Sequence, residues 1–187
     1  MLARPLIQFC KSCGAPVAYR LPDDGDTKER AVCTSCQTVH YENPLNVVGT
    51  IPYLEKEGKL YILLCMRNIE PRKGKWTLPA GFMELGETAT EGAMRETQEE
   101  AGAQIEIEGL FTVISVPAVG QVHLHYKAKL LSEDFNPGHE TKAVRLFSED
   151  DLPWDEMAFR SIKTTIKHFF KDAKAGIFKV HEVNLVV

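Results

Sequence analysis

The 187-residue chain lacks any apolar run long enough to cross a bilayer. A transmembrane helix needs about 20 consecutive, mostly apolar residues, and no stretch of this sequence approaches that length. The N-terminal sequence MLARPLIQFCKSCG also lacks the long apolar segment and small-residue cleavage site of a secretory signal peptide. These absences predict a cytoplasmic protein that has no membrane partner.

An excess of basic residues is absent as well. The chain has 22 Lys and Arg against 26 Asp and Glu, which gives a net charge of −4. Proteins that bind nucleic-acid polymers usually show a basic surplus or a basic stripe. We therefore expect no nucleic-acid polymer as a partner. A chain of 187 residues is long enough for one ordinary domain and a small appendage.

Cysteine is scarce beyond residue 40, where Cys65 stands alone in an apolar run. The other four cysteines form two Cys-x-x-Cys pairs separated by 19 residues: Cys10 with Cys13, and Cys33 with Cys36. This spacing is typical of a closed, tetrahedral Zn²⁺ site with a structural role. A redox dithiol or two disulfides are the alternatives, and a reducing compartment disfavours both. We predict a zinc ribbon over residues 1–43 and a second domain over residues 44–187.

From residue 45 onward, strand and helix signals alternate irregularly. The segment 76–87 is rich in Gly and Pro and predicts irregular structure. The remaining signals indicate a hairpin of strands at 46–55 and 59–67, strands at 104–117, 121–131 and 143–147, and helices at 88–101 and about 155–172. This order favours an α/β fold of the α+β type, with one mixed sheet between helices.

Helix 88–101 has clear end signals. Thr88 is a candidate N-cap with Glu91 three residues on, and Gly102 suits the position that ends a helix. One apolar stripe of this helix is expected to pack on the sheet, and it consists of Thr90, Met94, Thr97 and Ala101.

The same helix carries an acidic face. Glu96, Glu99 and Glu100 stand at i, i+3 and i+4, so their carboxylates are neighbours that repel each other. Clustered oxygen ligands select hard divalent ions such as Mg²⁺ or Mn²⁺. A solvated acidic face is the alternative. Basic and aromatic residues just before the helix, including Arg67 and Trp76, favour a site for a metal-bound polyanion.

The segment 81–103, GFMELGETATEGAMRETQEEAGA, resembles the signature of the Nudix hydrolases. Thr97 and Ala103 are smaller than the aliphatic residues usual at those two packing positions. The resemblance implies an α/β/α sandwich around a mixed sheet. The positions that match in register are Gly81, Glu87, Arg95, Glu96, Glu99, Glu100 and Gly102.

The resemblance also implies roles for these residues. Glu96, Glu99 and Glu100 would bind the catalytic metal, helped by the backbone carbonyl of Ala80. Arg95 would orient the glutamates. An activated water would attack a diphosphate linkage and give two phosphorylated products.

Other roles are less closely fixed by the resemblance. Glu87 is expected to be structural. Glu140 is the best-placed candidate for the general base by chain order, with a surface charge as the alternative. Arg67, Trp76 and Gly81 are expected to line the substrate site. Many relatives are homodimers, so a homodimer is a family expectation.

The substrate class follows from a second resemblance. The chain resembles the NADH pyrophosphatases in having a ribbon before a Nudix domain, but it lacks their SQPWPFP-type motif. It is more similar to a group that contains plant FAD pyrophosphatases, through YENPLNVVG, RNIEPRKGKWTLPAGFMELGE and PGHETKAVRLF. Pro117 falls where ADP-ribose pyrophosphatases carry a proline. We therefore predict hydrolysis of FAD or ADP-ribose to AMP and a second phosphorylated product. An NADH pyrophosphatase and a non-catalytic nucleotide sensor are alternatives, and a third is an enzyme that hydrolyses oxidised nucleoside triphosphates or mRNA caps.

Overall fold

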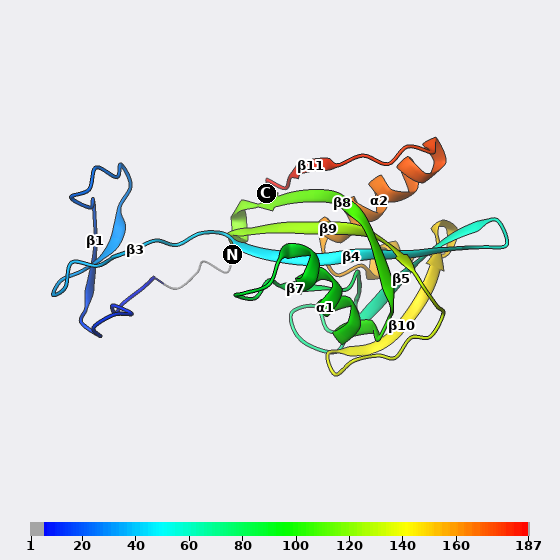
Figure 1. The fold of residues 1–187 in the computed structure, drawn as a ribbon, viewed down its shortest axis with the longest axis horizontal. Coiled ribbons are helices and arrows are strands. Elements are labelled where there is room, and N and C mark those ends of the chain that lie inside the picture. The colour runs from blue at the N-terminus through cyan, green and yellow to red at the C-terminus, as the bar shows by residue number, and fades with distance from the viewer. Residues whose placement is uncertain (1–5, 187) are drawn as a thin grey trace. The chain divides into compact units, whose positions relative to one another are not determined.

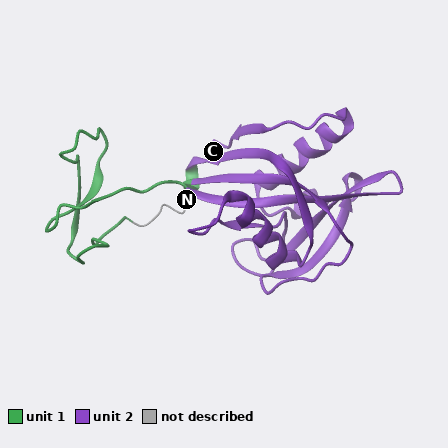
Figure 2. Ribbon diagram, in the orientation of Figure 1, with its two compact units in different colours: residues 1–44, 118–120 green, residues 45–117, 121–187 purple. Residues whose placement is uncertain are grey.

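The computed structural model describes residues 6–186. The described chain divides into two compact units (Figure 2). The first comprises residues up to 44 together with 118–120, and the second comprises residues 45–117 and those from 121 on. The prediction that the N-terminus has no signal peptide concerns residues that lie partly outside the described range. No helix among the described residues is both long enough and apolar enough to cross a bilayer.

The first unit is a three-stranded antiparallel sheet that carries the cysteines. Its strands are β1 (Val17–Arg20), β2 (Arg30–Cys33) and β3 (Val39–His40), in the order β1-β2-β3. The unit is so small that its buried hydrophobic set is little more than Ala31, Val32 and two of the cysteines. Domains with so little core usually depend on a metal or a cross-link for stability.

The second unit begins with the predicted hairpin. β4 (Leu45–Lys56) pairs antiparallel with β5 (Lys59–Arg67) through the two-residue turn Glu57-Gly58. Both turn residues have positive φ, 54° and 72°. This left-handed pair matches the twist of the strands that it joins.

The sheet of the second unit is mixed (Figure 1). Its strands lie in the order β10-β5-β4-β9-β8-β11, with β6 paired to β5 and β7 paired to β4. The β4–β9 and β8–β11 pairs are parallel and the others are antiparallel. The further strands are β6 (Trp76–Thr77), β7 (Ala80–Phe82), β8 (Ile105–Val116), β9 (Gln121–Leu130), β10 (Thr141–Ser148) and β11 (His181–Asn184).

Two helices cover opposite faces of this sheet. α1 (Ala89–Ala101) packs on one face, where the buried hydroxyls of Thr97 and Thr50 are hydrogen-bonded at 2.7 Å. α2 (Arg160–Ala175) packs on the other face, where Thr165 bonds Thr112 at 3.2 Å. The main core lies under α2 and includes Ile162, Ile166 and Phe169, which recur at helical spacing. The predicted α/β/α sandwich with a mixed sheet is therefore confirmed.

Two local predictions were wrong, and one strand was not predicted. The segment 76–87 contains the short strands β6 and β7, because β4 and β5 supply the hydrogen-bonding edges to which these Gly- and Pro-rich residues pair. β11 carried no recognised signal and is held by parallel pairing to β8. The second helix begins at Arg160 rather than near residue 155, because a separate 3₁₀ turn occupies Trp154–Glu156.

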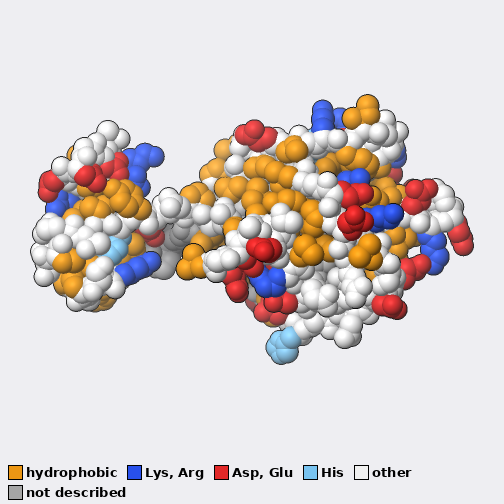
Figure 3. All heavy atoms as spheres, viewed as in Figure 1, with side chains coloured by type: hydrophobic (Ala, Val, Ile, Leu, Met, Phe, Trp, Pro, Cys, Tyr) orange, Lys and Arg blue, Asp and Glu red, His pale blue; other side chains and the backbone are white. Residues whose placement is uncertain are grey.

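The packing stripe of α1 was also placed incorrectly. Met94, expected on the sheet, is 44% exposed, whereas Ala93 and Glu100 are buried together with Thr97 and Ala101. In Figure 3 charged side chains gather over α1 and β7, beside hydrophobic side chains that lie over β8 and β9. The buried stripe is therefore rotated by about one residue, which turns Glu100 toward the sheet.

The Cys-rich unit gives a stability prediction. Replacing Cys33 with Ser removes one of four thiolates, so the chain should lose most of its zinc and the unit should unfold at a lower temperature. Metal analysis and thermal denaturation measure both effects. Ser35→Ala, an exposed change inside the same turn, serves as the matched control. One zinc per chain retained in Cys33→Ser would refute the four-cysteine site.

Candidate functional site

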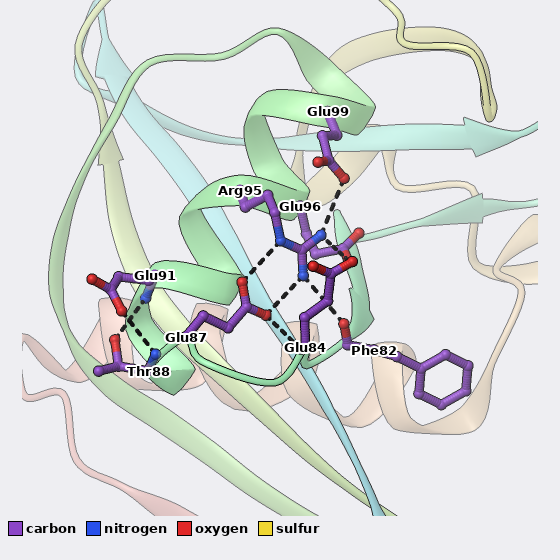
Figure 4. Close-up of polar contacts among 8 residues, drawn as sticks. All are labelled: Phe82, Glu84, Glu87, Thr88, Glu91, Arg95, Glu96 and Glu99. Carbon is purple, nitrogen blue, oxygen red and sulfur yellow. Dashed lines mark hydrogen bonds and ion pairs between the residues drawn. The ribbon is translucent and has the colours of Figure 1, made fainter.

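The side chain of Arg95 on α1 organises the acidic site (Figure 4). Its Nε and Nη2 donate to the two carboxylate oxygens of Glu87, each at 2.9 Å. Its Nη1 donates to Glu96 at 2.8 Å and to Glu99 at 3.1 Å. Nη2 also donates to the backbone carbonyl of Phe82 at 3.2 Å. One guanidinium thus ties the helix to the loop before it and to β7.

Glu87 has a structural position. Besides its paired bonds with Arg95, it accepts a hydrogen bond from the backbone N–H of Glu84 at 2.7 Å. The bonds from Arg95 lower the pKa of Glu87 to about 2, so this carboxylate stays charged at neutral pH. Next to it, Thr88 and Glu91 form the predicted capping box, with bonds of 2.8 and 3.2 Å. These contacts fix the start of α1.

Two glycines within the segment 81–103 make room for carboxylates. A Cβ on Gly81 would overlap the carboxylate of Glu96. A Cβ on Gly92 would overlap the carboxylate of Glu87 and crowd the side chain of Val48. Gly81 therefore allows β7 to lie directly against Glu96, and Gly92 allows α1 to lie directly against Glu87 of the preceding loop.

Glu100 is the most buried of the three helix glutamates, at 8% exposure. Its Oε2 accepts a hydrogen bond from the backbone N–H of Ala80 at 3.1 Å. Burial is the main cause that raises the pKa of Glu100 to about 7; the Ala80 hydrogen bond and the charge of Arg67 oppose the rise, and the charges of Glu96 and Glu140 add to it. Burial likewise raises the pKa of Glu96. For both carboxylates the nearby positive charge does not offset the effect of burial on the pKa.

Glu99 differs from its two neighbours. It is exposed, and its bond to Arg95 crosses one turn of the helix. The carboxylates of Glu96, Glu99 and Glu100 therefore share one side of α1 but do not converge within 4.8 Å in the described chain, as the four cysteine sulfurs do.

The loop 131–140 closes over the end of α1. The N–H of Asn136 donates to the carbonyl of Ala101 at 2.8 Å, and that of Gly138 donates to the carbonyl of Glu100 at 3.1 Å. A Cβ on Gly138 would overlap the carbonyl of Glu99. These bonds satisfy helix-end carbonyls and bring Glu140 close enough to influence Glu96 and Glu100. Our sequence reasoning missed Asn136 and Gly138, although the Asn-Pro-Gly turn was a usable signal.

Arg67 and Trp76, which were both expected to line the substrate site, have different surroundings. The charge of Arg67 acts on Glu100, while its Nε donates to the carbonyl of Pro71 at 2.8 Å and its guanidinium lies 5.3 Å from the ring centre of Phe159. Trp76 packs edge-on against Phe147 at 4.9 Å and contacts the main core. Arg67 therefore belongs to the electrostatic surroundings of the acidic site, and Trp76 lies at the edge of the core.

The residues present fit a divalent cation. Two of the three helix carboxylates, Glu96 and Glu100, have a raised pKa. The donors of Arg95 are divided among Glu87, Glu96, Glu99 and the Phe82 carbonyl, and none of these bonds reaches Glu100. A hard cation would supply the missing positive charge, and oxygen ligands of this kind bind Mg²⁺ or Mn²⁺. Ala80, the expected carbonyl ligand, lies beside Glu100 through its N–H.

The four cysteines of the first unit fit zinc. Their sulfur atoms all lie within 4.8 Å of one another, with three of the separations at 3.5 to 3.7 Å. A tetrahedron with Zn–S bonds of about 2.3 Å has edges of about 3.8 Å. Backbone N–H groups of Ser12, Ser35 and Cys36 point to the sulfurs of Cys10 and Cys33 at 3.3 to 3.4 Å. Such bonds stabilise thiolates.

Comparisons with known proteins agree with both units. The NUDIX domain model matches residues 44–169, and a Nudix N-terminal zinc-ribbon model matches residues 8–42. A NUDIX hydrolase structure from Nitrosomonas europaea is 46% identical, with a TM-score of 0.89, and the match covers 96% of this chain and 99% of that one.

Two relatives with named activities are less similar in sequence. An ADP-ribose pyrophosphatase from Methanocaldococcus jannaschii is 32% identical over 117 residues, which is 60% of this chain and 67% of that protein. The NAD-capped RNA hydrolase NudC from Salmonella heidelberg is 31% identical over 110 residues, and the matched part is only 38% of its length. The domain match, the complete signature and the shared fold together show that this chain belongs to the Nudix hydrolase family.

Proposed function

We propose that this protein is a divalent-metal-dependent pyrophosphatase that cleaves the diphosphate bond of an ADP-linked nucleotide, with FAD and ADP-ribose as the leading substrates. The proposal rests on the carboxylates of Glu96 and Glu100, which lie beside β7 and whose pKa is raised by burial. Arg67 lies close enough for its charge to act on Glu100. The named activity of the Methanocaldococcus jannaschii relative supports the substrate class. The products would be AMP and a second phosphorylated compound.

In this proposal residues 44–187 form the catalytic domain, and residues 1–43 form a ribbon that holds structural zinc. Glu96, Glu99 and Glu100 would hold Mg²⁺ or Mn²⁺, which supplies Lewis acidity and neutralises phosphate charge when bound. Arg95 keeps Glu96 and Glu99 in place through its hydrogen bonds.

The proton of the attacking water needs an acceptor. We propose Glu140 for this role, because it is exposed and lies near enough to Glu96 and Glu100 to raise the pKa of both. Arg67 would offer its charge to the substrate diphosphate. Because Gly81 has no side chain, the diphosphate of the substrate could approach the carboxylates closely.

A product assay tests the activity. With Mg²⁺ present, FAD, ADP-ribose and NADH are each incubated with the protein, and AMP is measured. AMP from FAD or ADP-ribose is the expected result. AMP from NADH alone would favour the NADH pyrophosphatase alternative, which the NudC relative keeps open. Tight binding of ADP-ribose without any product would instead identify a nucleotide sensor.

Glu100→Gln should remove most metal affinity and most activity. The amide can still accept the hydrogen bond from Ala80, and it carries no buried charge, so the fold should be retained without loss of thermal stability. Mn²⁺ titration, turnover and melting temperature are measured together. Glu84→Gln, which changes an exposed carboxylate in the same signature, is the control and should behave like wild type. Wild-type turnover in Glu100→Gln would sink the metal assignment.

Metal binding should depend on pH near neutrality. The pKa of Glu100 is raised to about 7 by burial, so its proton competes with the cation as the pH falls below that value. We expect the Mn²⁺ affinity to fall by up to about tenfold per pH unit below about pH 7 and to level off above it. Titrations near pH 6 and pH 8 measure the change. Equal affinities at both values would contradict it.

Glu140→Gln should lower kcat by about a hundredfold or more, since loss of a general base usually has this size of effect. Mn²⁺ affinity should change far less, because the glutamates on α1 remain. Glu133→Gln, in the same loop but paired with Lys56 at 2.9 Å, is the matched control. A kcat for Glu140→Gln equal to that of the control would return Glu140 to a surface role.

A further inference from the structure

α2 carries its positive charge on one side. Basic residues recur along this helix and form what we call the basic stripe: Arg160, Lys163, Lys167, Lys171 and Lys174. At about 100° of rotation per residue, they fall within about 80° of one another on the helix surface. The one acidic residue of α2, Asp172, is buried and paired with His181. The basic stripe therefore has no compensating carboxylate on its own helix, in a chain whose net charge is −4.

A groove lies beside the C-terminal half of the basic stripe. Its volume is about 420 Å³, and small-molecule sites usually have volumes of about 300 to 1,000 Å³. Trp154 and Phe170 give this α2 groove apolar surface. Lys167, Lys171 and Lys174 give it positive charge. The α2 groove thus combines an aromatic lining with three ammonium groups.

Two of the three lysines lack a partner carboxylate. Lys174 pairs with Glu149 at 2.7 Å, and Glu149 is the one acidic residue among the described residues that line the α2 groove. Lys167 and Lys171 are exposed and form no ion pair with any residue that the structure describes. They stand at i and i+4 on the helix, where like charges repel each other. An anionic group bound beside both ammonium groups would relieve this repulsion.

The apolar part of the α2 groove lies next to this charge. Trp154 is half-buried and packs against the main core, and Phe170 is buried. The Nζ of Lys167 lies 5.7 Å from the ring centre of Trp154. An indole ring offers a flat surface on which another aromatic ring can stack. A ligand that joins a flat ring to an anionic group would therefore contact both parts of the groove.

The charge of the groove wall favours a small ligand over a polymer. The wall that Glu149 and Trp154 supply belongs to an acidic segment, in which Asp150 and Asp151 are also exposed. A nucleic-acid strand that followed the basic stripe would bring several phosphates close to these carboxylates, and like charges would repel it. A small anion beside Lys167 and Lys171 would place only one anionic group there.

We propose that the α2 groove is a second ligand site, which binds a small aromatic phosphate of the nucleoside monophosphate class. The ring lies against Trp154, and the phosphate accepts hydrogen bonds from Lys167 and Lys171. The positive charge comes from the protein itself, so binding requires no divalent cation. Because α1 and α2 cover opposite faces of the sheet, this site is separate from the carboxylates of α1 and does not depend on the proposed function.

The indole N–H signals in the NMR spectrum of the full, zinc-loaded chain report binding at this site. The chain has two tryptophans, and the signal lost in Trp154→Phe identifies that of Trp154. AMP is titrated without added Mg²⁺ or Mn²⁺, and the shift of the Trp154 signal gives the dissociation constant. We expect the Trp154 signal to move and that of Trp76, which lies at the core edge, to stay. An unmoved Trp154 signal would overturn the proposal.

Two lysine variants test the charge. Lys171→Met removes one ammonium group but keeps an apolar side chain of similar length, and it should weaken AMP binding by on the order of fivefold. Lys163→Met is the matched control, because Lys163 belongs to the basic stripe but does not line the α2 groove. It should bind AMP like wild type. Equal AMP affinities in the two variants would overturn the role of the lysines.

Fragments of the ligand test whether ring and phosphate are both recognised. Adenosine has the ring without the phosphate, and inorganic phosphate has the anion without the ring. Each should bind at least about tenfold more weakly than AMP, since the loss of one stacking contact alone has about this effect. Inorganic phosphate that binds as tightly as AMP would reject the role of Trp154. Adenosine that binds as tightly as AMP would reject the role of the lysines.

The outcomes also distinguish this site from the activity. Glu100→Gln should shift the Trp154 signal with wild-type AMP affinity, because Glu100 lies on the other face of the sheet. A shift of the Trp154 signal in a protein that hydrolyses no substrate would support the second site and reject the proposed function. Hydrolysis of FAD or ADP-ribose by a protein whose Trp154 signal does not respond to AMP would reject the second site and keep the function.

Discussion

The guanidinium of Arg95 is the contact on which the acidic site depends. It binds Glu87 through two parallel hydrogen bonds and also reaches Glu96, Glu99 and the carbonyl of Phe82. Without this cation, carboxylates on one helix face would repel each other and turn apart. Because the same group also holds the preceding loop and β7, the position of α1 and the arrangement of its carboxylates are fixed together.

Charge in this site is balanced incompletely, and the imbalance suits metal binding. Arg95 compensates Glu87 fully enough to lower the pKa of that carboxyl to about 2, whereas burial raises the pKa of Glu100 to about 7. The first carboxylate is thereby committed to structure. The second is available to a cation, which gains more from a ligand whose charge the protein has not already satisfied.

Much of this arrangement could be predicted from the sequence, since it depends on local spacing. The hairpin of β4 and β5 follows from strand patterns around Glu57-Gly58, and α1 follows from Thr88, Glu91 and Gly102. Helical periodicity alone places three glutamates on one side. The two cysteine pairs likewise predicted a four-sulfur group, whose sulfur atoms the structure brings within 4.8 Å of one another.

Only the tertiary structure decided which groups are buried and what lies beside them. The periodicity of α1 could not show that Met94 faces solvent while Glu100 faces β7, because the stripe that is buried depends on where the sheet lies. Strand pairing across β7, β4 and β9 likewise placed Phe82 and His123 in one row, with Val47 between them. Sequence spacing fixed contacts within a turn or a hairpin, whereas burial and cross-strand neighbours depend on segments distant in the chain, which come together only when it folds.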